Sequence, residues 1–83
     1  MVLEKTHKLT LYNDNKHDFL YVIACLIRFC DHNPEQAEQC AVLVDGRESY
    51  DIKSGSFDDM YDLLVKLEMY ELKVEMNACD LYQ

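Results

Sequence analysis

The stretch "LTLYNDNKHDFLYVIACLIRFC" at residues 9–30 decides the fold, because a strand, a polar turn and an apolar helix follow one another within it. Leu9 and Leu11 alternate with polar residues, which predicts a half-buried strand over residues 8–12. Residues 13–17 contain Asn and Asp side chains that can hydrogen-bond their own backbone, which is typical of a turn. The turn therefore places polar side chains beside the most apolar segment of the chain.

That apolar segment predicts a helix over residues 19–31, with Asp18 as its N-cap. One apolar stripe at helical spacing consists of Phe19, Val22, Ile23, Leu26 and Cys30. A second stripe on another face consists of Leu20, Ala24 and Ile27. When a helix is apolar on more than one side, the domain core covers one side and another surface must cover the other. The second stripe is therefore a candidate partner or dimer face.

A second helix is predicted to begin after Asn33, which is a suitable cap, with Pro34 at the first position and Gln36 at the capping-box position. Its apolar side consists of Ala37, Cys40, Ala41 and Val44. Asp45-Gly46 is a turn signal and is predicted to end this helix.

The remaining elements are a strand over residues 49–53, a third helix capped by Ser56 and a strand over residues 72–76. The predicted core face of the third helix consists of Phe57, Met60, Leu64 and Leu67. The element order β-α-α-β-α-β predicts a two-layer α+β domain. Its three helices would pack on one face of a small three-stranded, mainly antiparallel sheet.

Length and composition indicate one domain over residues 1–83, with a short N-terminal arm at 1–7 and a C-terminal tail at 77–83. A hydrophobic content of 49% excludes a disordered chain. The net charge of -8 argues against binding to nucleic acid or to an anionic membrane and favours cationic partners, such as a peptide's α-ammonium group. The longest apolar run, residues 19–30, is shorter than the roughly 20 residues of a membrane span, so we expect a cytoplasmic protein.

The cysteines show no zinc-like spacing and no C-x-x-C pair, so we expect buried, reduced thiols and no metal or other cofactor. They are Cys25, Cys30, Cys40 and Cys79. Cys30 and His32 are the closest thiol–imidazole pair, but two residues apart on a helix they would point in different directions, so we expect no enzyme. His17 and His32 are predicted to be surface loop residues, and His7 has no predicted partner.

The segment "LYNDNKHDFLYVIACLIRF" resembles the "NDD-x-T-P-M-x-F-V" signature of the ClpS family, without gaps from His7 to Asp45 and loosely onward to Met76. Members of this bacterial family are adaptors that deliver N-degron substrates to the AAA+ unfoldase of the Clp protease for proteolysis. The resemblance implies a fold shared with the C-terminal domain of the ribosomal stalk protein. It also implies a ClpA- or ClpC-like unfoldase and substrate N-terminal peptides as partners.

In that family, a pocket at the strand-to-helix junction binds the α-amino group and the first side chain of a substrate. The resemblance assigns Asn13 and Asp14 to the amino group, together with Asp45, which stands where the family has a histidine. The apolar part of the pocket would consist of Phe19, Val22, Ala41, Val44 and Leu72. Charge-assisted hydrogen bonds and burial of a Leu or Phe side chain each contribute about 1.5–3 kcal/mol, which suits binding at micromolar strength.

The chain departs from the family pattern at several pocket positions. Asn15 stands where a second Asp is usual, Phe19 replaces the gate methionine, and Ala41 stands where a methionine guards the cavity. The extra carboxylate of Asp45 should point to water when no cation is bound. The long N-terminal arm used in delivery has no counterpart within residues 1–7.

Two alternatives remain open at this stage. Residues 13–15 are also typical of an ordinary turn before a helix, with no binding role. A divergent relative could keep the fold, lose the N-degron site and act as an interaction or dimerisation module through Leu20, Ala24 and Ile27.

Overall fold

A computed structural model describes residues 6–14 and 16–79 of the chain. The elements are β1 (Thr6–Tyr12), α1 (Phe19–Cys30), α2 (Pro34–Arg47), β2 (Ser49–Gly55), α3 (Phe57–Met69) and β3 (Val74–Cys79). The predicted order of strands and helices is confirmed.

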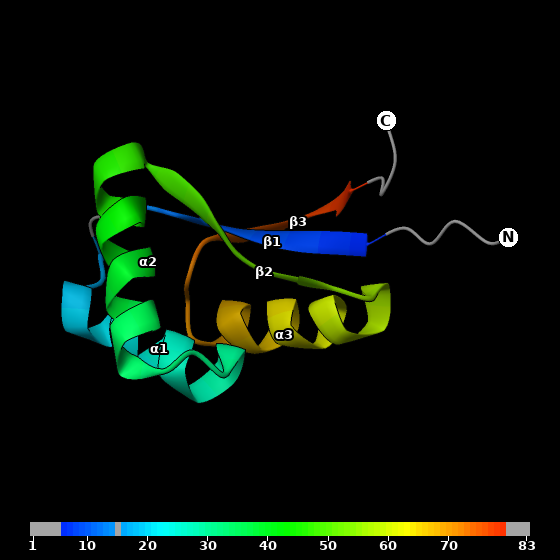
Figure 1. Cartoon of the computed structure of the whole chain (residues 1–83), viewed down its shortest axis with the longest axis horizontal. Helices are drawn as coiled ribbons and strands as arrows, with labels where there is room; N and C mark the ends of the chain where they lie inside the picture. The colour runs from blue at the N-terminus through cyan, green and yellow to red at the C-terminus, as the bar shows by residue number, and fades with distance from the viewer. Residues whose placement is uncertain (1–5, 15, 80–83) are drawn as a thin grey trace, which may run out of the picture.

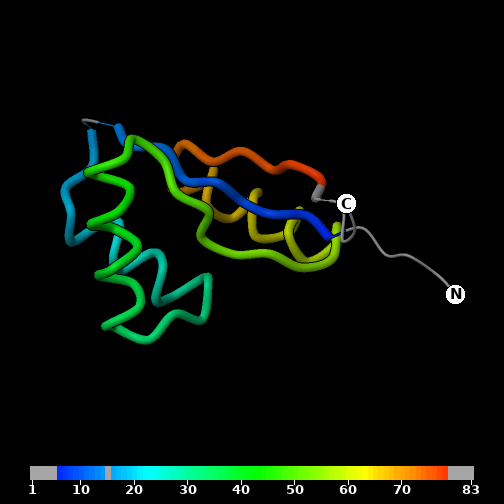
Figure 2. The backbone as a smooth tube through the Cα atoms, turned by 45° about the horizontal axis from the view of Figure 1, so that its top comes forward, coloured from blue at the N-terminus to red at the C-terminus, as the bar shows by residue number. Residues whose placement is uncertain are grey.

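The three strands form one antiparallel sheet in the order β2-β1-β3, with β1 in the centre. Figure 1 shows α3 running along one side of this sheet, with α1 and α2 at one end of it. The tube in Figure 2 shows the same arrangement from a second direction. The predicted α+β fold is therefore confirmed, and the end of β1 lies where α1 and α2 meet the sheet.

The core forms where β1 meets the helices. Leu9 and Leu11 are 0% and 1% exposed, and they belong to one cluster with Leu26 of α1 and Leu67 of α3. Thr10, on the other face of the strand, donates a hydrogen bond from its hydroxyl to Asp51 at 2.7 Å. The alternation in the sequence thus predicted the buried face of the central strand.

All three predicted helix caps are confirmed, because each side chain accepts a hydrogen bond from the backbone three residues later. The bonds are Tyr21 N to Asp18 Oδ1 (2.9 Å), Gln36 N to Asn33 Oδ1 (2.7 Å) and Asp59 N to Ser56 Oγ (3.2 Å).

Several predicted boundaries are wrong, beginning with the end of α2. Asp45 and Gly46 lie inside this helix, which continues to Arg47, and the left-handed residue that ends it is Glu48, at φ 74°. The Asp-Gly signal failed because Gly46 keeps a negative φ and needs no special conformation. The adjacent strand β2 then extends to Gly55.

The central strand β1, the outer strand β3 and the helix α3 also differ from the prediction. Backbone pairing of Thr6 with Cys79 extends β1 and β3 into the predicted arm and tail, because ladder hydrogen bonds need no apolar alternation. Leu72 precedes β3 instead of lying in it. On α3, Leu63 is buried, although it was not part of the predicted core face. Of the residues that were predicted there, Leu64 is half-buried and Phe57 is 49% exposed. The aromatic ring of Phe57 packs instead on the imidazole of His7, at 5.2 Å between centroids, so His7 has a partner.

The prediction that His32 is a surface residue is wrong, because its side chain is only 6% exposed. Its Nε2 donates to the carbonyl oxygen of Ile52 at 3.0 Å. The pairing register between β1 and β2 shifts at this point, where Leu9 faces Lys53 and Thr10 faces Asp51, so Ile52 is the extra residue of a β-bulge. His32 therefore satisfies a buried carbonyl at the irregular point of the ladder.

We predict that His32→Leu, which keeps an apolar side chain of similar size but has no donor, lowers the free energy of unfolding by about 1–3 kcal/mol, because the Ile52 carbonyl loses its partner. Urea unfolding followed by circular dichroism measures this loss. His32→Gln keeps a donor and should lose less. Equal stability of the Leu variant and the wild type would contradict this role for the hydrogen bond.

Candidate functional site

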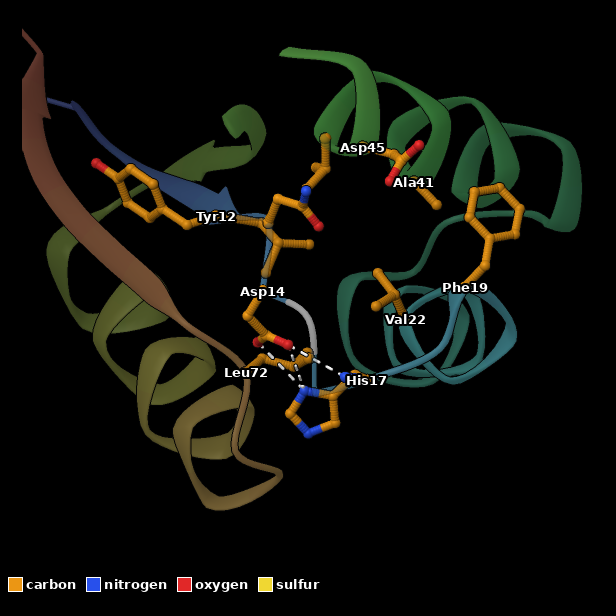
Figure 3. Close-up of a pocket in the computed structure, with 11 residues that line it drawn as sticks. Tyr12, Asp14, His17, Phe19, Val22, Ala41, Asp45 and Leu72 are labelled. Carbon is orange, nitrogen blue, oxygen red and sulfur yellow. Dashed lines mark hydrogen bonds and ion pairs between the residues drawn. The ribbon is translucent and has the colours of Figure 1, made fainter. Parts of the chain in front are cut away.

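A pocket of about 250 Å³ lies at the junction of β1, α1 and α2 (Figure 3). Its lining contains all eight residues that were predicted for the site, namely Asn13, Asp14, Phe19, Val22, Ala41, Val44, Asp45 and Leu72. The structure therefore brings these residues together, and their role in binding stays a prediction. The lining also contains Leu11, Tyr12 and His17, which were not predicted.

The end of β1, which lines the pocket, is fixed by two backbone hydrogen bonds. Tyr12 N donates to the carbonyl of Lys73 at 2.9 Å, and Asn13 N donates to the carbonyl of Glu48 at 2.8 Å. The first bond ties the strand to the segment before β3, and the second ties it to the C-cap of α2. The polar residues after Tyr12 are thus held where the end of β1, the C-terminus of α2 and the segment before β3 meet.

The apolar wall comes from both helices and from the segment before β3. Ala41 and Val44 of α2 are 3% and 5% exposed, and Leu72 is 4% exposed. Val22 of α1 is half-buried, and Phe19 at the start of that helix is 40% exposed. In Figure 3, Phe19 and Val22 lie on the side of the pocket opposite Tyr12. An exposed ring next to a buried wall is consistent with the gate position predicted for Phe19.

Asp14 organises the turn between β1 and α1. Its Oδ1 accepts hydrogen bonds from the backbone N of Lys16 at 2.9 Å and of His17 at 3.1 Å. Burial acts to raise the pKa of this carboxyl, but these two donors and the His17 side chain outweigh it, so the pKa is lowered from its usual value. Asp14 is therefore an ionised hydrogen-bond acceptor at neutral pH.

The prediction that His17 is a surface loop residue is wrong, because its side chain is only 13% exposed. Its Nδ1 lies 3.1 Å from Oδ1 and 3.2 Å from Oδ2 of Asp14, and its ring stacks on Tyr21 with 4.8 Å between centroids. An acidic residue followed by a histidine three positions later in a turn is the sequence signal that could have predicted this contact.

Asp45 lies apart from Asp14. Figure 3 shows the Asp14 carboxylate pointing toward His17 and Asp45 at the far end of the pocket, on α2. Asp45 is exposed, as expected for a second carboxylate without a cation, and its side chain makes no hydrogen bond or ion pair with any residue that the structure describes. The pocket therefore has an internally bonded carboxylate at one end and an unpaired one at the other.

None of the three thiols that the structure describes lines the pocket, and their surroundings oppose ionisation. Cys25, Cys30 and Cys40 are buried, and burial raises the pKa of each; for Cys30 the pKa is about 12. The thiolate is the nucleophilic form of cysteine, so none of these three thiols is activated for attack. The prediction for Cys79 concerns a side chain outside the described part of the structure.

Comparisons with known proteins show the family of this chain. Residues 3–75 match the family described as ATP-dependent Clp protease adaptor protein ClpS. The chain belongs to the ClpS family. Its adaptor role for the Clp protease follows from that membership, as do partnership with protease components and substrates and the absence of enzymatic activity.

Among solved structures, that of Agrobacterium tumefaciens ClpS2 bound to L-phenylalaninamide is similar to this ClpS family member, with a TM-score of 0.78. The match covers 90% of this chain and 98% of the ClpS2 chain at 15% sequence identity, so it shows the shared fold. A search of curated protein sequences gives no match. Within residues 6–14 and 16–79, no helix has the length and apolar character to cross a membrane.

We predict that Asp14→Ala lowers the free energy of unfolding by about 1–2 kcal/mol at pH 7, because the backbone donors of the turn lose their acceptor. The pKa of Asp14 is lowered in the folded state, so its stabilising effect is present above the unfolded value of about 3.9 and is lost as the pH falls through the folded value. Denaturant unfolding of both proteins at several pH values measures this difference. If the difference in the free energy of unfolding between the wild type and the variant does not decrease at acidic pH, this role of the Asp14 carboxylate is contradicted.

Proposed function

We propose that this ClpS family member binds the free N-terminus of substrate proteins that begin with a bulky apolar residue, and hands them to a ClpA- or ClpC-like unfoldase. The single observation that supports this proposal is the pocket at the end of β1. It combines acceptors for a cation with a buried apolar wall inside one volume of about 250 Å³. An N-terminal residue offers the complementary pair, an α-ammonium group and a side chain that start from the same carbon.

The acceptors in the pocket suit an ammonium group. The carboxylate of Asp45 has no internal partner among the described residues, and the side-chain carbonyl of Asn13 is an acceptor on the same lining. Hydrogen bonds to charged groups contribute about 1.5–3 kcal/mol each. The Asp45 carboxylate also attracts the ammonium group by its charge, so it would replace the family's histidine with a stronger anchor for a cation.

The first side chain of the substrate would pack between the helices. Val22, Ala41 and Leu72 belong to the apolar part of the lining, and Ala41 leaves more space than the methionine usual in the family. Burying a Leu or Phe side chain stabilises the complex by about 1.5–3 kcal/mol before the cost of association. L-phenylalaninamide, which is bound in the similar ClpS2 structure, has the same two features, a free α-amine and a large apolar side chain.

We predict that a peptide beginning with a free Phe or Leu binds at micromolar strength and that N-acetylation of the same peptide reduces binding at least tenfold, because the ammonium group is lost. Fluorescence anisotropy with a label at the peptide's C-terminal end measures this. A peptide of the same sequence beginning with Ala should also bind weakly. Equal affinity for the free and acetylated peptides, or no binding of either, would contradict the proposed function.

A variant of Asp45 localises this interaction. Asp45 is exposed and unpaired within the described residues, so Asp45→Asn should leave stability within about 0.5 kcal/mol of the wild type. Its affinity for the free peptide should fall about tenfold, because a full charge is removed from the acceptor set. Unchanged affinity would show that Asp45 does not contact the amine.

A second candidate function, self-association, is supported by the exposed face of α1. Leu20 and Ile27 are 72% and 38% exposed, and Ala24 lies between them on the same side of the helix. A second copy packed antiparallel across this face would place Ala24 against Ala24 at a two-fold axis, where small side chains permit close contact. The net charge of -8 on each copy opposes this contact, so salt should strengthen it.

We predict a weak dimer in sedimentation at high protein concentration, strengthened at about 0.5 M salt, where charge repulsion is screened. Leu20→Glu should remove the dimer, because it places a charge in the apolar contact. Val42→Glu is a matched control, since Val42 is also exposed, at 53%, but lies on α2. A monomer under all these conditions would contradict the proposed dimer face.

A further inference from the structure

Among the described residues, His17 supplies the one side chain that hydrogen-bonds Asp14. It was absent from the predicted site, yet it lines the same pocket. Its ring stacks on Tyr21 with an interplanar angle of 14°, and the side chains of His17 and Asp14 are 13% and 22% exposed. The imidazole is therefore held in a defined position between the turn and α1 (Figure 3).

The two oxygens of Asp14 are not equivalent. Oδ1 accepts from Lys16 N, from His17 N and from the ring of His17. Oδ2 contacts the ring of His17 at 3.2 Å and has no other donor among the described residues. Each carboxylate oxygen has about two lone-pair directions, so Oδ1 is saturated and Oδ2 can accept one more hydrogen bond. A cation that enters the pocket would reach Asp14 through Oδ2, the oxygen that His17 already contacts.

We propose that His17 is a positioning residue that holds Asp14 in the turn and competes with a substrate's α-ammonium group for Oδ2, so that protonation of the imidazole weakens substrate binding. This inference rests on the proposed function, because it concerns the same pocket and the same ligand. It gives a role to a residue at which the chain departs from the family signature, since His17 stands where threonine is usual.

The direction of the effect follows from charge. A carboxylate accepts hydrogen bonds, so Nδ1 of His17 donates in either protonation state. With a neutral imidazole, Asp14 keeps its full charge for the incoming ammonium group. With an imidazolium, the charge of Asp14 is compensated, and the ammonium group also meets a second cation at short range. Because acid favours the imidazolium, the affinity for substrate should fall as the pH is lowered.

Other ionisable groups lie in the turn, next to Tyr21 or elsewhere on the pocket lining, and the experiment must distinguish their effect from that of His17. They are Lys16 in the turn, Asp18 and Tyr21 at the start of α1, Asp45 on α2, Tyr12 on β1 and Glu71 before β3. Side chains of these types change charge little between about pH 5.5 and pH 7, whereas histidine changes charge within that range. A peptide's α-amino group, with a usual pKa of about 7.7–8.0, is mainly protonated at both limits.

The test compares the wild type with His17→Gln, whose amide can donate to Asp14 but does not titrate. Binding of an unblocked peptide that begins with Phe is measured at about pH 7 and about pH 5.5. Wild-type affinity should fall about five- to tenfold on acidification, and the affinity of the variant should change less than about twofold. His7 and His32 remain in the variant, so any effect from them would appear in both proteins.

The outcomes separate this inference from the proposed function. An equal fall in both proteins, or no fall in the wild type, overturns the role of His17 while binding itself stands. No binding of the peptide to either protein at either pH overturns both. A measurement on the wild type alone covers the case in which the variant does not fold. At about pH 6, adding the peptide should shift the NMR signals of the His17 ring toward the neutral form, since coupling between two binding events is reciprocal. Unmoved ring signals at saturating peptide would also overturn the inference.

Discussion

The structure depends on the turn that joins the central strand to the first helix. β1 pairs with both other strands and contributes Leu9 and Leu11 to the core, and only the six residues 13–18 separate its end from the apolar helix α1. A junction this short needs partners for its own backbone groups, because unpaired amides beside a core are costly. Asp14 provides them by accepting from two successive backbone amides. One carboxylate thus fixes the direction in which α1 leaves the sheet.

The pocket is a consequence of the same junction. Tyr12 and Asn13 are tied by their backbone amides to the segments before β3 and after α2, so the polar end of β1 lies against the apolar sides of the helices. A site of this kind can receive a charged group and an apolar group from one ligand without rearranging the fold. The donors of this short turn already occupy most acceptor positions of Asp14, so the exposed Asp45, whose side chain has no partner among the described residues, is the stronger candidate for a new cation.

The sequence predicted those features that local chemistry determines. The caps Asp18, Asn33 and Ser56 and the alternation in β1 are properties of a few neighbouring residues, and all of them agree with the structure. Features that depend on distant contacts were missed. His32 contacts the carbonyl of Ile52 at a β-bulge twenty residues later in the chain, and α2 continues through Gly46, which keeps a helical backbone with negative φ. The eight site residues were predicted from the resemblance to a family. His17 was missed because it departs from that family's signature.

The most direct test of this account is a crystal structure of the protein with L-phenylalaninamide. We predict that the compound lies in the pocket at the end of β1, with its amine hydrogen-bonded to Asn13 or to one of the two carboxylates, Asp14 and Asp45, and its ring against Val22 and Ala41. A complex in which the compound lies outside this pocket, or in which the amine faces solvent, would contradict the account.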